Sequence, residues 1–325
     1  MDYDIIATLG PASEQESTWQ KMIAAGVTGF RLNTSHLSLD QLWGWLERLA
    51  PFLEKAGPSY SVVLDLQGSK WRLGQFLPFL LREGSRVMLV HALESSRDGV
   101  LPVPHADFFR AAPQSSPEIV LNDAKSRLVV ESLGADSIQA RVVLGGEIAP
   151  RKGITFSAST FRTEALSEKD QEIFAQTRGL GFIHYAVSYV KDAVEMEHYR
   201  CLFGQEASLA AKLERGPAMQ DSARIAAHAD SLWVCRGDLG SELGLKRMAE
   251  AVSILTMQLR TLPVPVFMAG QVLEHMTAYA TPTRSEVCYL HDALQAGYKG
   301  FVLSDETAVG RSPVDSCQTA ALFKS

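Results

Sequence analysis

The feature that most constrains the fold of this chain is a regular alternation of short apolar runs with longer amphipathic segments. The apolar runs have the length of buried strands and lie at 3–9, 29–32, 61–65, 181–186, 208–212, 231–235, 264–269 and 300–303. The segments with helical periodicity lie at 14–25, 39–56, 168–178, 192–201, 217–228, 245–261 and 284–296. Eight strands that alternate with helices predict an α/β fold of the (β/α)₈ TIM-barrel type.

One region, residues 75–150, interrupts this alternation. Short alternating runs at 85–90, 127–132 and 137–144 replace the helical period there, and prolines and glycines separate them. The pattern predicts a small β-barrel domain inserted after the third strand, so that the barrel domain consists of residues 1–74 and 151–325. Because a loop after a barrel strand lies over the face that carries active sites, we expect the insertion to act as a lid.

Composition and charge argue against several classes of function. The 325 residues carry a net charge of −6 and the pI is about 5.8, so no nucleic-acid partner is expected. No secretion signal is recognisable at the N-terminus, and no apolar run approaches the roughly 20 residues that cross a bilayer. The four cysteines are scattered without metal-site spacing. We therefore expect a cytoplasmic protein with reduced thiols and no membrane partner.

Charged side chains follow two neighbouring predicted strands. Lys212 and Glu214 stand at the end of the strand at 208–212, and Asp238 follows the strand at 231–235. Because the carboxyl ends of barrel strands meet at one face, we expect these side chains to lie together. Two carboxylates with substrate oxygens and water suit a hard divalent cation, Mg²⁺ or Mn²⁺. The alternative is a network of ion pairs that caps the barrel.

Other predicted strand ends add positive charge to the same face. Arg31 follows the second strand, and Lys70 and Arg72 follow the third. Several cations beside two metal-type carboxylates are typical of a site for an anionic phosphate substrate with Mg²⁺.

A series of motifs then gives a specific resemblance. In chain order they are IATLGPAS (6–13), RLNTSH (31–36), LDLQGSKWRLG (64–74), GGEIAPRKG (145–153), LSEKD (166–170), AKLE (211–214), RGDLG (236–240), ATPTRSEV (280–287) and LSDETA (303–308). This series resembles the pyruvate kinase family over nearly the whole chain. The resemblance implies a barrel with a lid and transfer of a phosphoryl group from phosphoenolpyruvate to ADP, which gives pyruvate and ATP.

The resemblance also implies roles for individual residues. Glu214 and Asp238 would bind the divalent metal, and Lys212 would stabilise the phosphoryl group in transit. Arg31 and Arg72 would clamp the phosphates, and the backbone at Gly237 and Asp238 would bind the substrate carboxylate. Pro11, Asn33, His36 and Lys152 match nucleotide contacts, and Asp123 matches an aspartate of the lid. Ser304 and Glu306 match a network that relays a proton. A packed structural imidazole is the alternative for His36, and a turn aspartate is the alternative for Asp123.

Lys70 departs from the usual family pattern. Most members carry Asp-Thr-Lys-Gly-Pro-Glu where this chain has DLQGSK, and the Thr and Glu belong to a monovalent-cation site. Potassium-independent members share the Leu, Gln and Lys, so the resemblance implies that the Lys70 ammonium replaces K⁺ and that no K⁺ is required. The alternative is a solvated surface lysine.

Two further departures lie near the expected site of proton delivery. Gly270 stands where the family has a threonine, which removes a hydroxyl donor and enlarges the cavity, and Asp305 replaces a glycine. The usual carboxy-terminal effector domain has no counterpart in the sequence, so we expect no familiar allosteric activation and retain a homodimer through the barrel face as a hypothesis. Two other functions stay open: a metal-dependent lyase or aldolase that acts through a pyruvate enolate, and a non-catalytic binding protein.

Overall fold

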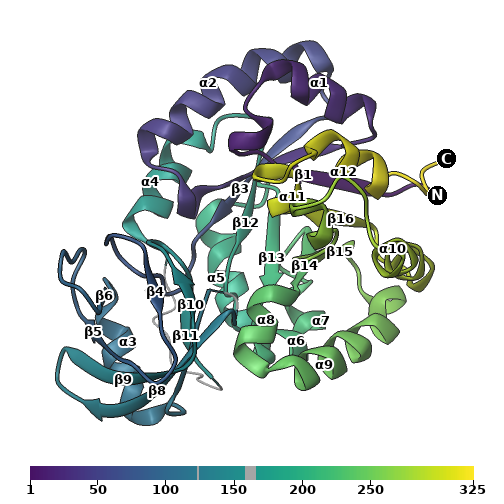
Figure 1. Cartoon of the computed structure of the whole chain (residues 1–325). Coiled ribbons are helices and arrows are strands. Elements are labelled where there is room, and N and C mark those ends of the chain that lie inside the picture. Colours follow the sequence, from purple (N-terminus) through teal and green to yellow (C-terminus); the bar gives the residue numbers. More distant parts are fainter. Residues whose placement is uncertain (123, 158–165) are drawn as a thin grey trace.

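Eight parallel strands form a closed barrel in a computed structural model that describes residues 1–122, 124–157 and 166–325 (Figure 1). Around the barrel they follow the order β1-β16-β15-β14-β13-β12-β3-β2. Their bounds are β1 (Asp4–Thr8), β2 (Gly29–Asn33), β3 (Ser61–Leu66), β12 (Ile183–Val187), β13 (Leu209–Leu213), β14 (Ser231–Cys235), β15 (Val266–Ala269) and β16 (Gly300–Leu303). The predicted (β/α)₈ fold is confirmed.

Helices surround this barrel, and the two chain ends lie side by side (Figure 1). The longer ones are α1 (Glu16–Ala24), α2 (Leu39–Ala56), α4 (Glu168–Thr177), α5 (Ala193–Phe203), α9 (Leu245–Gln258), α10 (Arg284–Ala296) and α12 (Pro313–Ala320). Helix α2 illustrates the sequence signals that form these helices. Ser38 and Gln41 make a capping box at its start, and the buried Leu42, Leu46 and Leu49 lie on one face at helical spacing.

Side chains alternate between the two faces of each barrel strand, and this alternation positions the site. In β14, Leu232 and Val234 belong to the core between strands and helices, whereas Trp233 and Cys235 point into the barrel. The interior cluster also contains Val63, Ala186, Ala210, Phe267, Ala269 and Val302. Apolar side chains therefore fill the barrel, and polar side chains are left for its carboxyl end.

The segment inserted after β3 is a β-rich unit with a core of its own. Strands β11 (Ile154–Phe156), β7 (Glu118–Leu121), β8 (Ser126–Leu133), β9 (Ser137–Leu144), β5 (Arg86–Val90) and β6 (Val100–Pro102) form a sheet in that order. Strands β4 (Phe79–Leu81) and β10 (Gly146–Ile148) pair separately. The rings of Phe108 and Phe156 stack at 4.6 Å, and Trp71 meets Phe108 edge-on. We call this unit the lid.

One expectation about helices was wrong, and the inserted region holds two short helices that the sequence patterns did not indicate. The region at 75–150 does contain helices, α3 (Ala106–Ala111) and η3 (Ala112–Gln114), which are too short to show a period. The single helix expected at 217–228 is two, α6 (Gly216–Gln220) and α7 (Ser222–Ile225). Asp221 between them leaves helical geometry, and its carboxylate accepts a hydrogen bond from the Ala193 N–H at 2.8 Å. Three short helices, α8 (Arg236–Leu243), α11 (Asp305–Ala308) and η2 (Thr34–His36), follow barrel strands directly.

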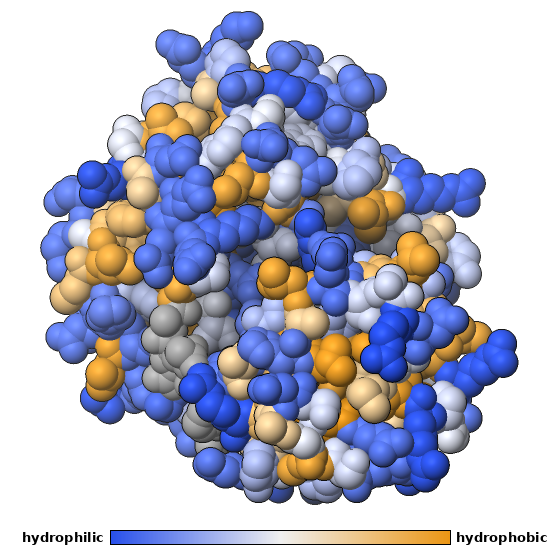
Figure 2. Space-filling view, turned by 90° about the vertical axis from the view of Figure 1, so that its left-hand side faces the viewer, coloured by the Kyte–Doolittle hydropathy of each residue, from blue (hydrophilic) through white to orange (hydrophobic). Residues whose placement is uncertain are grey.

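The face of the molecule shown in Figure 2 is mainly hydrophilic, with scattered groups of exposed hydrophobic residues. Exposed apolar side chains include Leu77 and Leu93 in the lid and Leu245 and Met257 on α9. Among the described residues, no helix combines the length and the apolar character needed to cross a membrane.

Candidate active site

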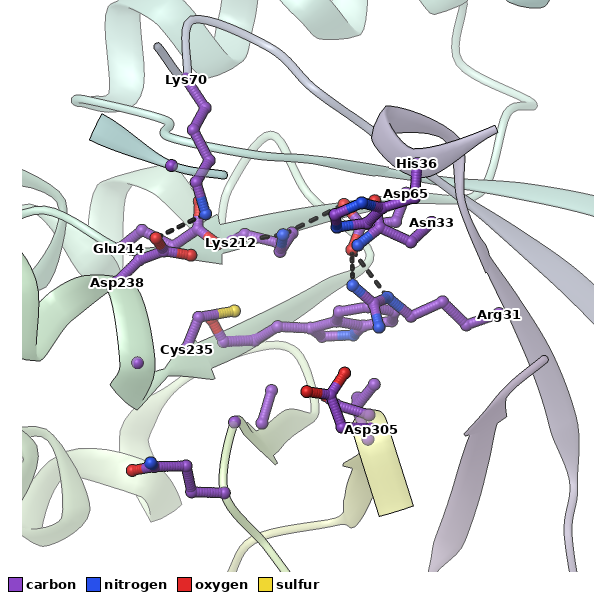
Figure 3. Close-up of a pocket in the computed structure, with 18 of the residues that line it drawn as sticks. Arg31, Asn33, His36, Asp65, Lys70, Lys212, Glu214, Cys235, Asp238 and Asp305 are labelled. Carbon is purple, nitrogen blue, oxygen red and sulfur yellow. Dashed lines mark hydrogen bonds and ion pairs between the residues drawn. The ribbon is translucent and has the colours of Figure 1, made fainter. Parts of the chain in front are cut away.

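A cavity of about 170 Å³ opens at the carboxyl end of the barrel, between the barrel strands and the lid (Figure 3). Its lining contains most of the side chains that the sequence singles out: Arg31, Asn33, His36, Lys70, Arg72, Lys152, Lys212, Glu214, Gly237, Asp238, Gly270, Ser304 and Asp305. The expectation that Lys212, Glu214 and Asp238 share one hollow is confirmed.

Asp65, in β3, is the centre of a closed network on one side of this cavity. Its carboxylate accepts hydrogen bonds from Arg31 Nε at 2.7 Å, from Lys212 Nζ at 3.0 Å and from Ser188 Oγ at 3.1 Å. Arg31 also donates to Thr8 Oγ1 at 2.7 Å. Asp65 is 2% exposed, so these interactions are screened little by solvent. The network fixes the positions of both cations.

Charges within this network shift the pKa values of its members. Burial alone would raise the pKa of Asp65, but Lys212 and Arg31 hold it well below its ordinary value. Burial alone would lower the pKa of Lys212, but the carboxylates of Asp65 and Glu214 raise it above its ordinary value. Both groups are therefore charged at neutral pH, and Lys212 presents a permanent positive charge to the cavity.

Glu214 and Asp238 form the second, less closed group. Glu214, just after β13, accepts hydrogen bonds from the Tyr189 N–H at 2.7 Å and pairs with Lys212 Nζ at 2.9 Å. Asp238, in the first turn of α8, pairs with Lys70 Nζ at 2.5 Å. Figure 3 shows Lys70 reaching these carboxylates from one side while Arg31 and Asp65 lie on the other, with Lys212 between them.

The two carboxyl groups influence each other. Burial, together with the charge of Asp238, raises the pKa of Glu214 despite the nearby Lys212. Burial would also raise the pKa of Asp238, but Lys70 and Lys212 lower it to about 2. Two neighbouring buried carboxyl groups, one of which raises the pKa of the other, favour a cation that lies between them.

This donor set fits a hard divalent ion held by two protein carboxylates. No group of three or more His, Cys, Asp and Glu side chains suited to a metal occurs in the described ranges. A metal at Glu214 and Asp238 would therefore take its other ligands from substrate and water, as Mg²⁺ sites for phosphate substrates usually do.

Gly270, after β15, opens the start of α8 to the cavity. Its φ is +73°, and a Cβ at this position would come 3.2 Å from the Gly237 N and 3.3 Å from the Arg236 N. The Arg236 guanidinium holds the same turn through the carbonyl oxygens of Gly270 and Gln271, at 2.9 and 2.7 Å. Glycine thus leaves backbone N–H groups at a helix start accessible to an anion.

The far end of the cavity, between η2 and the lid, carries the residues expected on the nucleotide side. Asn33, His36 and Lys152 line it, and Arg72, expected as a phosphate clamp, also lines the cavity. Arg151 of the lid donates to the His36 carbonyl at 3.0 Å, which ties the lid to η2. Burial, and then the charges of Arg72 and Lys152, lower the pKa of His36 to about 3, so its imidazole is neutral at physiological pH.

Two expected site residues lie outside the cavity lining, and a third cannot be placed. Glu306 in α11 is buried outside the cavity lining, where its carboxylate accepts hydrogen bonds from the N–H groups of Ser304 and Leu273 at 2.9 and 3.3 Å. Pro11 begins the 3-10 helix η1 (Pro11–Ser13) and is exposed outside the lining. Asp123 lies outside the described residues.

Two residues that contribute to the site were missed by the sequence reasoning. Asp65 is the last residue of a predicted strand, so it lies at the barrel face where the metal-type carboxylates were expected, and this position was the available signal. Ser188 follows β12 and donates to Asp65 while it accepts from Lys212 Nζ at 2.8 Å. A serine after a strand is too common to have indicated this.

Comparisons with known proteins point to one family. The family model described as pyruvate kinase, barrel domain, matches residues 2–317. The pyruvate kinase of Agrobacterium vitis is 31% identical over 322 residues, which cover 97% of this chain and 67% of that protein. The pyruvate kinase of Aeropyrum pernix is also 31% identical, over 99% of this chain and 70% of its own length. The chain spans about two thirds of the length of these relatives.

Proposed function

Because the chain belongs to the pyruvate kinase family, we propose that it is a phosphotransferase that moves a phosphoryl group from phosphoenolpyruvate to ADP and yields pyruvate and ATP. The observation that carries the proposal is the meeting of Lys212, Glu214 and Asp238 in one small cavity. Phosphoryl transfer depends almost entirely on positioning and on electrostatic stabilisation, and this cavity holds fixed cations beside a pair of carboxylates.

In this proposal Glu214 and Asp238 hold Mg²⁺ or Mn²⁺. When bound, the ion supplies positive charge to the phosphate and carboxylate oxygens of the substrate. The N–H groups at the start of α8, which Gly270 leaves accessible, bind the carboxylate of phosphoenolpyruvate.

Lys212 and Arg31 act on the phosphoryl group. The charge of Lys212 lies where negative charge would develop on the transferred oxygens, and its hydrogen bonds to Asp65 and Ser188 keep it from moving during the reaction. Arg31 is fixed by the same carboxylate, and Arg72 reaches the cavity from the lid side, where its guanidinium donates to the Arg151 carbonyl at 2.8 Å. Pre-positioned donors of this kind cost little reorganisation when the substrate reacts.

ADP binds at the opposite end of the cavity in this proposal. The neutral His36, Asn33 and Lys152 line that end, and a neutral imidazole can accept as well as donate hydrogen bonds. The buried ammonium of Lys70 supplies a positive charge within the site, so turnover is proposed to need no K⁺.

The space beside Gly270 favours a second candidate function. The glycine leaves room beside the carboxylate-binding N–H groups, which favours a lyase or aldolase that adds a carbonyl compound to a pyruvate enolate. The nucleotide-side residues argue against it, since such a reaction uses no ADP.

One set of assays separates the candidates. The protein is incubated with phosphoenolpyruvate, ADP and Mg²⁺, in K⁺ and in K⁺-free tetramethylammonium buffer, and pyruvate is measured. The proposed function predicts turnover that requires Mg²⁺ and is equal in both buffers. If no pyruvate forms while the methyl protons of added pyruvate exchange with D₂O in a metal-dependent reaction, the lyase candidate is favoured. If neither reaction occurs and phosphoenolpyruvate still binds, the protein is a non-catalytic member of the family.

A further inference from the structure

Lys70 is a buried lysine whose ammonium group lies on a carboxylate that the proposed metal needs. Its Nζ is 2.5 Å from Asp238 Oδ1, and the two side chains are only 8% and 15% exposed. An ion pair with so little exposure is weakly screened by salt. Any cation that binds Asp238 must therefore compete with Lys70.

The Lys70 side chain follows a confined path to this carboxylate. A Cβ on Gly153 of the lid would come 3.1 Å from Lys70 Cε, so a larger residue there would press on the lysine. The Lys70 Nζ also lies 5.7 Å from the centre of the Tyr189 ring, within the range of a cation–π interaction. Two hydrogen bonds between Gln67 and Lys70, at 3.1 and 3.2 Å, fix the turn that carries the lysine. The structure thus aims this ammonium group at the cavity and does not leave it in solvent.

The other lysine at the centre of the site is held differently. Lys212 contacts two carboxylates and the Ser188 hydroxyl, so no single ligand can release it. The contacts described for the Lys70 ammonium are one carboxylate oxygen and one aromatic ring. Of the two ammonium groups, Lys70 is therefore the one that can exchange its partner at low cost.

We propose that Lys70 is a displaceable counter-ion of the metal site, which neutralises Asp238 before the metal binds and turns to the substrate phosphate when the metal takes Asp238. The proposal rests on the proposed metal site at Glu214 and Asp238. It implies that metal alone binds weakly, because it must displace an ammonium group. It also implies that metal and phosphoenolpyruvate strengthen each other's binding, since the substrate gives the released lysine a new partner.

Mn²⁺ binding, followed by the electron paramagnetic resonance signal of the free ion, tests this without an activity assay. Removal of the competing charge in Lys70→Met should tighten the binding of Mn²⁺ alone by about 10- to 100-fold, the range over which groups next to metal ligands change affinity. Lys70→Gln, which is neutral but still able to donate a hydrogen bond to Asp238, should tighten it in the same direction. The matched control is Lys125→Met, which removes the same charge from the lid side of the cavity and should change the affinity far less.

The same titrations with saturating phosphoenolpyruvate measure the coupling between the two ligands. In the unaltered protein the substrate should strengthen Mn²⁺ binding by a larger factor than in Lys70→Met, because only the former has a lysine to release. Equal Mn²⁺ affinity in the unaltered protein and both Lys70 variants would overturn the inference, as would equal tightening in Lys125→Met. Retention of Mn²⁺ binding by both Glu214→Gln and Asp238→Asn would instead refute the metal site itself, and with it the proposed function.

Discussion

The two sides of the cavity use the same kinds of side chain in opposite ways. The Asp65 carboxylate accepts hydrogen bonds from Arg31, Lys212 and Ser188, so its negative charge has several partners. Asp238, by contrast, has one lysine partner, Lys70, and its charge helps to raise the pKa of the neighbouring Glu214. We call these the Asp65 network and the Asp238 pair.

This difference indicates what each side does. The charge of Asp65 is already balanced by two cations, so this network is suited to position Arg31 and Lys212. The Asp238 pair carries negative charge that is only partly balanced, which suits an exchangeable cation. The number of partners, and not the residue type, therefore distinguishes a positioning aspartate from the aspartate that we propose as a metal ligand.

The largest effect expected from the difference between the Asp65 network and the Asp238 pair is on the stability of the fold. Asp65→Asn leaves two buried cations without their shared carboxylate and should lower the free energy of unfolding by about 3–5 kcal/mol. Asp238→Asn removes a charge that opposes Glu214 and should cost much less. Urea unfolding of both variants at pH 7 measures this, and equal losses would show that the two sides do not differ as described.

Lys212 should dominate the chemistry. Lys212→Met removes the fixed charge beside the transferred phosphoryl group and should lower kcat by about 100- to 1,000-fold. Lys246→Met is the control, since Lys246 is exposed on α9. Pyruvate formation at saturating substrate gives kcat, and circular dichroism checks that the variant is folded. A loss confined to KM would contradict the assigned role.

Glu306 is a third buried carboxyl group, and it has backbone N–H partners instead of cations. Burial raises its pKa from an ordinary 4.5 to about 7, so the native protein keeps a proton that the unfolded chain releases above pH 4.5. Its contribution to stability should be full below pH 4.5 and should decline by about 2–3 kcal/mol as the pH rises to 7.

His36 acts in the opposite direction over part of this range, because its lowered pKa makes stability increase with pH. The measurement for Glu306 is therefore a difference: unfolding free energies of the unaltered protein minus those of Glu306→Gln, at intervals from pH 4.5 to 8. The difference should fall with pH and then become constant. A difference that does not vary with pH would show that Glu306 is not protonated in the native state.

The smallest effect is expected at Gly270. In Gly270→Ala the new Cβ meets the Gly237 and Arg236 nitrogens and adopts an unfavourable φ, which should cost about 1 kcal/mol of stability. The KM for phosphoenolpyruvate should rise because the methyl group covers the N–H groups proposed to bind its carboxylate. An unchanged KM would mean that the carboxylate binds elsewhere.

The sequence predicted the scaffold better than the contacts within the site. Strand β14 and helices α2 and α10 begin and end where periodicity and capping residues place them, because their signals are local. The gathering of Lys212, Glu214 and Asp238 was also predictable, since barrel topology brings strand ends to one face.

The pairing of these groups was not predictable. An aspartate at or just after a strand end has the same appearance in the sequence whether it binds three neighbours, two of them cations, as Asp65 does, or a single lysine, as Asp238 does. That difference depends on side-chain directions set by segments far apart in the chain, such as the approach of Gly153 to Lys70. The break at Asp221 was missed for a similar reason, because its carboxylate is drawn to a neighbouring helix.

The most direct test of the account is a crystal structure of the protein with Mn²⁺ and phosphoenolpyruvate, in which anomalous scattering locates the metal. We predict a Mn²⁺ ion bound by Glu214 and Asp238, with the Lys70 ammonium moved from Asp238 to the phosphate and the Arg31–Asp65–Lys212 contacts unchanged. A Mn²⁺ ion bound elsewhere, or a Lys70–Asp238 ion pair that persists beside the bound ion, would contradict it.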